Sequence, residues 1–182
     1  MKKDRSIKCY FCRMFRAGIL SDTHGFLHPR VLHFVEKVDE IWHAGDIGDL
    51  KTIDRIAKIK PLVAVYGNID GQELRLRYPK TVHFQREAVK VMMTHIGGYP
   101  GRYDSSVRRV IEEEKPGLFI CGHSHILKVM YDKKQKLLHI NPGAAGKYGF
   151  HTSVTAVRLV LDGNGFRDLE VLDIPRGRMS ED

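Results

Sequence analysis

Three segments near the N-terminus decide the fold: FRAGILSDTHG (residues 15–25), EIWHAGD (40–46) and PLVAVYGN (61–68). Each is a short apolar run that ends in glycine with aspartate or asparagine, the pattern of a buried strand followed by a turn. Two helical stretches separate them. Strands that alternate with helices in this way predict a parallel sheet with α/β architecture.

The two stretches between these strands have helical patterns. The first begins at Pro29, a favourable first helical position, and we expect it to run to about Val38. The second, residues 49–59, is amphipathic, and one face of it carries four apolar side chains: Leu50, Ile53, Ile56 and Ala57.

The second half of the chain has a different pattern of predicted elements. Two strand-like runs over residues 81–95 are followed by a helix at about 105–114 and a strand in GLFICGHSH (117–125). Residues 128–141 and 152–174 have the pattern of two hairpins, the second turning at Asp162-Gly163-Asn164-Gly165. We expect this half to be mainly antiparallel.

Length and charge point to one soluble domain. The chain has 182 residues, and 42% hydrophobic and 29% charged residues are ordinary globular values. The net charge is +8, but six of the basic residues lie within the first sixteen positions. We expect residues 1–13 to be a disordered basic extension and residues 14–182 to form a single domain.

Cysteine content and hydropathy suggest a cytoplasmic protein. Three cysteines suit a reducing compartment better than a disulfide scaffold, and no run approaches the ~18 apolar residues of a membrane span. Cys9 and Cys12 lack the second pair that a zinc knuckle needs. Trp42 and Cys121 lie in apolar strands and are expected in the core.

Residues that can bind metals follow five of the predicted strands. They comprise four histidines, two aspartates and one asparagine: Asp22, His24, Asp46, Asn68, His95, His123 and His125. Sites in α/β sheets form outside the carboxyl ends of strands, so these side chains are expected to converge in one crevice. Each alone has an ordinary alternative role in a turn, a cap or the core, but five such coincidences are improbable.

Seven ligands exceed what one ion uses, and a carboxylate shared at Asp46 would place two ions about 3.5–4 Å apart. Nitrogen and oxygen donors without thiolate suit manganese, iron, zinc, nickel or cobalt. We therefore predict two divalent transition metal ions, with manganese as the first candidate.

The motifs Asp22-x-His24, Gly45-Asp46, Gly67-Asn68, His95 and Gly122-His123-Ser124-His125, in this order, resemble those of the calcineurin-like metallophosphoesterase superfamily. The short chain is similar to the YfcE-type phosphodiesterases, and to the retromer scaffold subunit of the same fold. The resemblance spans about residues 15–174. It implies a four-layer α/β/β/α sandwich of mixed sheets.

The resemblance also implies the roles of the site residues. One metal would be bound by Asp22, His24, Asp46 and His125, and the other by Asp46, Asn68, His95 and His123. The implied activity is that of a phosphoric diester hydrolase in which a metal-bridging hydroxide attacks phosphorus. Asp46, Asn68 and His95 would be the catalytic residues.

One position departs from the wider superfamily. Many members have a histidine directly after the Gly-Asn pair, where it assists the leaving oxygen, but this chain has Ile69. YfcE-type members share this lack. The departure predicts a preference for phosphodiesters over monoesters.

The expected partner is a small phosphodiester or nucleotide-like substrate, with no membrane; a homo-oligomer is compatible with the sequence. The main alternative is a protein-binding scaffold of the same fold with little catalysis. Specific nucleic-acid binding is the weakest alternative, because the body of the chain lacks a basic stripe. Among the histidines outside the motifs, His151 is the best candidate for the rim of the site.

Overall fold

The computed structural model describes residues 14–176. The expected extension at residues 1–13, with Cys9 and Cys12, lies outside the described residues. The strands are β1 Phe15–Leu20, β2 Glu40–His43, β3 Leu62–Ala64, β4 Thr81–Arg86, β5 Val89–Thr94, β6 Gly98–Tyr99, β7 Arg102–Tyr103, β8 Leu118–Ile120, β9 Leu127–Asp132, β10 Leu137–Pro142, β11 Ser153–Asp162 and β12 Gly165–Pro175. The helices are α1 Pro29–Val35, α2 Leu50–Ala57, α3 Gln72–Arg77 and α4 Ser105–Glu114.

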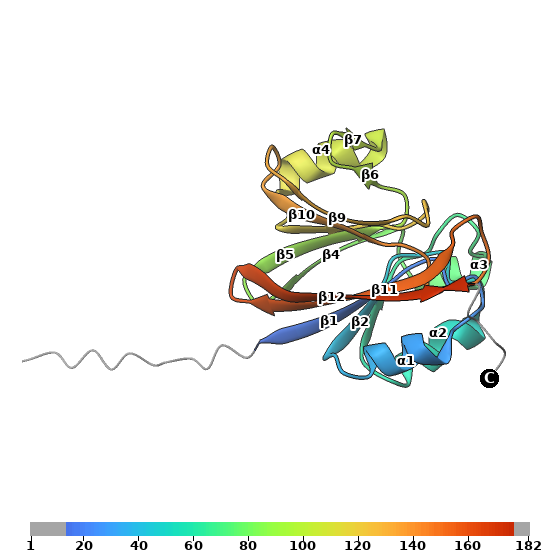
Figure 1. Cartoon of the computed structure of the whole chain (residues 1–182). Coiled ribbons are helices and arrows are strands. Elements are labelled where there is room, and N and C mark those ends of the chain that lie inside the picture. The colour runs from blue at the N-terminus through green and yellow to red at the C-terminus, as the bar shows by residue number, and fades with distance from the viewer. Residues whose placement is uncertain (1–13, 177–182) are drawn as a thin grey trace, which may run out of the picture.

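The strands form two five-stranded sheets with the orders β12-β11-β1-β2-β3 and β4-β5-β8-β10-β9. The sheets pack face to face, with α1 and α2 outside the first and α4 outside the second (Figure 1). This confirms the predicted α/β/β/α sandwich of mixed sheets. A separate pair, β6 and β7, lies beside α4.

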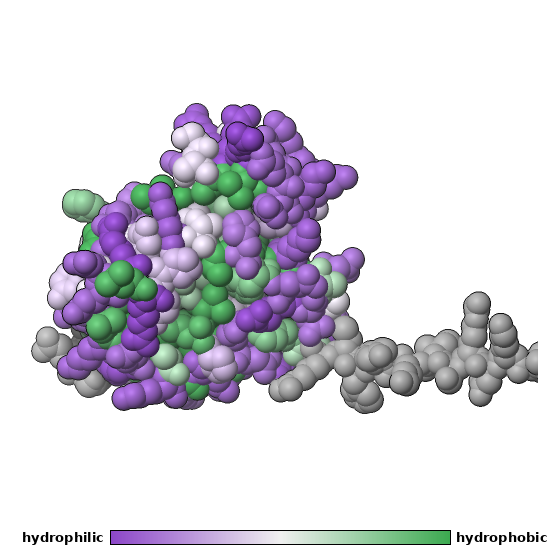
Figure 2. Space-filling model, turned by 180° about the vertical axis from the view of Figure 1, so that it is seen from behind, coloured by the Kyte–Doolittle hydropathy of each residue, from purple (hydrophilic) through white to green (hydrophobic). Residues whose placement is uncertain are grey.

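Three apolar clusters fill the spaces between the layers. The first lies between α1, α2 and the first sheet, the second between the two sheets, and the third under α4. Trp42 belongs to the second cluster and Cys121 to the third, and both are fully buried, as predicted. On the face shown in Figure 2, hydrophilic residues cover the top and the rim, and hydrophobic residues gather across the middle.

The first half of the chain follows the predicted pattern closely. Strands β1, β2 and β3 pair in parallel. Helix α1 is shorter than expected, since it ends at Val35 rather than near Val38. On α2, Ile53 and Ile56 are buried, but Ala57 is exposed, so the buried face does not include Ala57 as predicted.

The second half of the chain is mainly antiparallel, as expected, and the two predicted hairpins form as β9–β10 and β11–β12. The centre of the second sheet is the exception. Strand β8 pairs in parallel with both β5 and β10, while the outer pairs β4–β5 and β9–β10 are antiparallel. The connection through α4 allows β5 and β8 to run in the same direction. The short elements α3, β6 and β7 were not predicted. None of the helices between residues 14 and 176 is both long and apolar enough to cross a membrane.

Candidate metal centre

The seven predicted ligands all follow the carboxyl ends of parallel strands. Asp22 and His24 follow β1, Asp46 follows β2, and Asn68 follows β3; His95 follows β5, and His123 and His125 follow β8. Because parallel strands end at the same edge, each sheet delivers its loops to one side of the sandwich. The contacts below show that the two sets of loops meet there.

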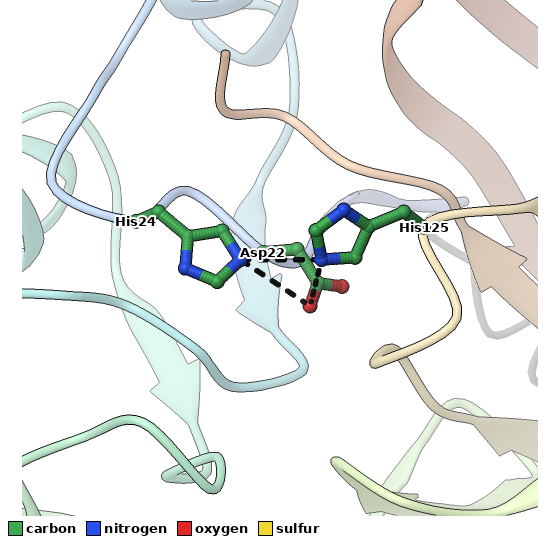
Figure 3. Close-up of side chains that lie close together, drawn as sticks. All are labelled: Asp22, His24 and His125. Carbon is green, nitrogen blue, oxygen red and sulfur yellow. Dashed lines mark hydrogen bonds and ion pairs between the residues drawn. The ribbon is translucent and has the colours of Figure 1, made fainter. Parts of the chain in front are cut away.

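The first ligand group joins both sheets and consists of Asp22, His24 and His125 (Figure 3). The Oδ1 atom of Asp22 lies 3.2 Å from Nε2 of His125 and 3.9 Å from Nε2 of His24. The two Nε2 atoms are 3.2 Å apart. Three potential donor atoms thus face one point.

The buried Oδ1 of Asp22 accepts no hydrogen bond from the described residues. A buried carboxylate oxygen without a hydrogen bond is costly, because it has lost its hydration. The other oxygen, Oδ2, accepts a hydrogen bond from the backbone N–H of His123. A cation between Asp22 and the two imidazoles would satisfy the atom that the chain leaves open, so this group fits a metal ion.

The second ligand group consists of Asp46, His95 and His123, and Asn68 adjoins it. Nε2 of His95 lies 3.2 Å from Oδ2 of Asp46 and 3.0 Å from Oδ1 of Asn68. The His95 and His123 rings are 5.2 Å apart between centroids.

The tautomer of His95 supports a ligand role. Its Nδ1 lies 2.8 Å from the carbonyl oxygen of Ala44, so Nδ1 carries a hydrogen that it donates to this carbonyl. In the neutral ring, Nε2 then has a lone pair, which faces two oxygen acceptors on Asp46 and Asn68. Three lone pairs directed at one another fit a shared cation, and the Ala44 contact is the outer-shell bond that orients metal-binding histidines.

Electrostatics at the second group favour a cation. Burial opposes charge on His95, but the negative charges of the neighbouring Asp46 and Asp22 carboxylates raise the pKa of His95 overall. Burial alone would raise the pKa of Asp46, but His95, the Ile69 N–H and the nearby His24 hold it below its usual range. The backbone N–H of His24 donates a hydrogen bond to the carbonyl oxygen of Asp46 at 3.0 Å, so the loops of the two groups are in contact.

Five of the seven residues have left-handed backbone conformations. Their φ angles are 54° at Asp22, 48° at His24, 53° at Asp46, 70° at His123 and 57° at His125. Such angles cost of order 1–3 kcal/mol each in residues other than glycine and cluster at functional sites. The loops therefore give up local stability to aim these side chains inward.

Two glycines allow the loops to approach the aspartates. A Cβ atom at Gly67 would lie 2.0 Å from Oδ1 of Asp46, and one at Gly122 would lie 1.9 Å from Oγ of Ser21 and 2.8 Å from Oδ2 of Asp22. Only glycine fits at such distances, so Gly67 and Gly122 set how closely the ligand loops pack.

Residues outside the motifs hold these loops in place. Buried Asp70 accepts hydrogen bonds from the backbone N–H groups of Gly48 and Gly67, and thereby ties two ligand loops together. Asn141 donates to the carbonyl of Gly122 and to Ser124, so it supports the loop of His123. Sequence reasoning missed Asp70, whose signal is an acidic residue two positions after Asn68, and Asn141 likewise lies outside the predicted ligand set.

His151 lies at the site, where sequence reasoning placed a rim residue. Its Nδ1 is 3.1 Å from Nδ1 of His125, and its Nε2 is 3.0 Å from the carbonyl oxygen of Gly146. His151 therefore orients the His125 ring from the side opposite Asp22. Cys121 does not take part, since burial raises the pKa of its thiol to about 12.

Comparisons with known proteins identify a family and a fold to which this chain is similar. Residues 15–164 match the family model of the calcineurin-like phosphoesterase superfamily domain. A probable metallophosphoesterase of Methanocaldococcus jannaschii is 29% identical over 133 residues, which cover 70% of this chain and 66% of that protein, just under two thirds of its length.

Two solved structures share the fold. Vacuolar Protein Sorting 29 of Cryptosporidium parvum has a TM-score of 0.68 and 16% identity, covering 90% of this chain and 99% of that one. An archaeal phosphodiesterase has a TM-score of 0.67 and 24% identity, covering 86% and 99%. The fold is thus found in a phosphodiesterase and in a protein of vacuolar sorting.

Proposed function

The chain belongs to the calcineurin-like phosphoesterase superfamily, and from this premise we propose that it is a metal-dependent phosphodiesterase with a dinuclear centre. The observation that carries the proposal is the pair of adjacent ligand groups, each with one buried carboxylate and two imidazoles. Asp22, His24 and His125 would hold one ion, and Asn68, His95 and His123 the other. Asp46 would contact both. Manganese is our first candidate, and iron, zinc, nickel and cobalt share the same donor preference.

When bound, two divalent ions supply an acidified water as nucleophile and positive charge that offsets the charge of the transition state. The side chains fix this arrangement. The Ala44 carbonyl holds the ring of His95, and the Ile69 N–H binds Oδ1 of Asp46 at 3.1 Å, which leaves Oδ2 directed at His95. The exposed Ile69 side chain has no proton to give to a leaving alkoxide.

The proposed substrate is a small phosphodiester. Two divalent ions and two aspartates leave a positive site, and a diester carries a single negative charge. The archaeal phosphodiesterase of the same fold supports this choice. The proposed setting is the cytoplasm.

Purified protein tests the proposal. We expect it to hydrolyse bis(4-nitrophenyl) phosphate after addition of Mn²⁺, to stop after chelation with EDTA, and to recover when Mn²⁺ is restored. Parallel assays with the other four ions would rank the metals. Absence of hydrolysis with every ion would reject the phosphodiesterase.

A protein-binding scaffold remains the second candidate, favoured by the similarity to Vacuolar Protein Sorting 29. Calorimetric titration with Mn²⁺ separates the two. Binding of two ions without hydrolysis of any diester would favour the scaffold, whereas binding together with turnover supports the enzyme.

A further inference from the structure

Two hollows adjoin the second ligand group, one at His123 and the other at His95. The first, here the Tyr99 hollow, has a volume of about 320 Å³, and its wall includes His123. The second, the Tyr66 hollow, has a volume of about 420 Å³, and its wall includes His95 and Asn68. Since the His95 and His123 rings are 5.2 Å apart, a phosphate bound at this group would border both hollows.

A narrow boundary separates the hollows. Ile96 and Asp104 line both of them. The Ile96 side chain is 41% exposed, and Asp104 is the N-cap of α4. The hollows are therefore neighbours that share one wall, with the second ligand group at the junction.

The wall of each hollow includes one tyrosine, one lysine and one arginine. In the first, the Lys128 ammonium lies 4.0 Å from the centroid of the Tyr99 ring, and Arg102 adds a second cation. In the second, the Arg75 guanidinium lies 4.9 Å from the centroid of the Tyr66 ring, and Lys80 adds the second cation.

These aromatic and cationic side chains suit the binding of nucleoside groups. Aromatic side chains stack on bases whatever their sequence, and nearby cations favour the anionic backbone. A carboxylate at the boundary can accept a hydrogen bond from a sugar hydroxyl or an amino group. Both volumes fall in the range of ligand pockets, about 300–1,000 Å³.

We propose that the hollows are two subsites, each of which receives one alcohol arm of the phosphodiester, and that the preferred substrate is a linear diester with an aromatic base in both arms, as in a dinucleotide. This inference rests on the proposed function and specifies its substrate class. A monoester, or a diester with one small arm, would leave one hollow empty.

Kinetics with matched substrates test the proposal. Bis(4-nitrophenyl) phosphate has two aryl arms, whereas methyl 4-nitrophenyl phosphate has one and the same leaving group. We expect Tyr99→Ala and Tyr66→Ala each to raise KM for the diaryl ester by roughly 5-fold to 100-fold, since stacking is lost. Tyr99→Phe and Tyr66→Phe should retain wild-type KM. With the methyl ester, only the variant in the leaving-group hollow should differ from wild type.

The control is Tyr131→Ala, an exposed tyrosine on β9 that lines neither hollow. If neither alanine variant raised KM for the diaryl ester above this control, the subsites would be rejected. Equal effects of both variants on the methyl ester would contradict the assignment of one arm to each hollow.

A binding measurement separates failure of this inference from failure of the proposed function. Mn²⁺-loaded protein is titrated with dithymidine phosphorothioate and with its one-base analogue, thymidine 3′-methyl phosphorothioate. We expect tighter binding of the two-base ligand, and loss of that advantage in both alanine variants. This result supports the subsites even if wild type hydrolyses no diester. Equal affinity of wild type for the two ligands overturns them.

Discussion

The Nε2 atoms of His24 and His125 lie 3.2 Å apart, although 101 positions separate the two residues in the chain. One follows a strand of the first sheet and the other follows a strand of the second. Two neutral imidazoles can share only one hydrogen along this line, yet Oδ1 of Asp22 also faces both. A cation at this point would satisfy all three atoms.

Loss of the negative charge at position 46 should remove most activity. Asp46→Asn keeps the shape of the side chain but not the charge that would offset two ions, so we expect a fall in kcat of roughly 100-fold or more on bis(4-nitrophenyl) phosphate. Asp54→Asn, an exposed aspartate paired with Arg77, is the matched control. Full turnover of the Asp46 variant at saturating Mn²⁺ would show that Asp46 is not a ligand.

A methyl group at position 122 should weaken both fold and site. The Cβ of Gly122→Ala would collide with Ser21 and approach Asp22, so we expect a loss of about 1–3 kcal/mol in the free energy of unfolding, measured with urea. Mn²⁺ affinity should also fall. Gly71→Ala, at the N-cap of α3, where a Cβ meets nothing within 4 Å, should cost less stability than Gly122→Ala and should leave Mn²⁺ affinity unchanged. Similar behaviour of the two variants would contradict the close approach.

Acid should destabilise the protein partly through His139. Burial, with a contribution from Lys128, lowers its pKa to about 4, and neither ring nitrogen has a hydrogen-bond partner among the described residues. Below pH ~6.5 the unfolded chain binds a proton that the folded chain does not, so stability falls as the pH drops towards 4. The contribution of one such residue is about 3 kcal/mol.

Substitution of His139 tests this pH dependence. Its ring packs between Phe119 and Tyr103, so His139→Phe should fold and should lose less stability than wild type between pH 6.5 and 4.5. His83→Phe, at an exposed position, should keep the wild-type slope. The free energy of unfolding is measured with urea at each pH. If it had the same slope against pH in wild type and in His139→Phe, the prediction would be wrong.

A histidine at position 69 should assist poor leaving groups. The Ile69 side chain is 49% exposed, so it does not simply pack beneath the turn, and its N–H bond to Asp46 does not depend on the side chain. General acid catalysis contributes about 10²–10⁴-fold, and we expect Ile69→His to gain on alkyl esters and little on activated aryl esters. If wild type already cleaves alkyl monoesters as fast as aryl diesters, the protein does not lack a general acid for the leaving group, and the prediction is wrong.

Deletion of residues 1–13 should leave metal binding and turnover unchanged, because this segment contains five basic residues and one acidic residue but no candidate ligand. Kinetics and urea unfolding of the truncated protein check this expectation. A large loss in either quantity would show that the segment contributes to the site or the core.

The sequence by itself determined the order of the main elements and the types of ligand residue. Apolar runs and turn residues are local signals, so β1, β2 and β3 and helix α4 could be predicted from short windows. The same local logic placed aspartate, asparagine and histidine directly after strands. Local patterns predicted the ends of helices less reliably, as the exposure of Ala57 and the early end of α1 show.

Tertiary structure decided which of these residues meet. Periodicity does not specify strand pairing, so the parallel neighbours of β8 could not be read from the sequence. For the same reason, the contacts of Asp70 with two ligand loops and of His151 with His125 could not be predicted. The Tyr66 hollow likewise forms where segments that follow the first sheet meet segments of the second, and the Tyr99 hollow forms between separate segments of the second half of the chain. Such contacts are set by packing between layers, which involves residues far apart in the chain, whereas sequence patterns report only what each segment prefers locally.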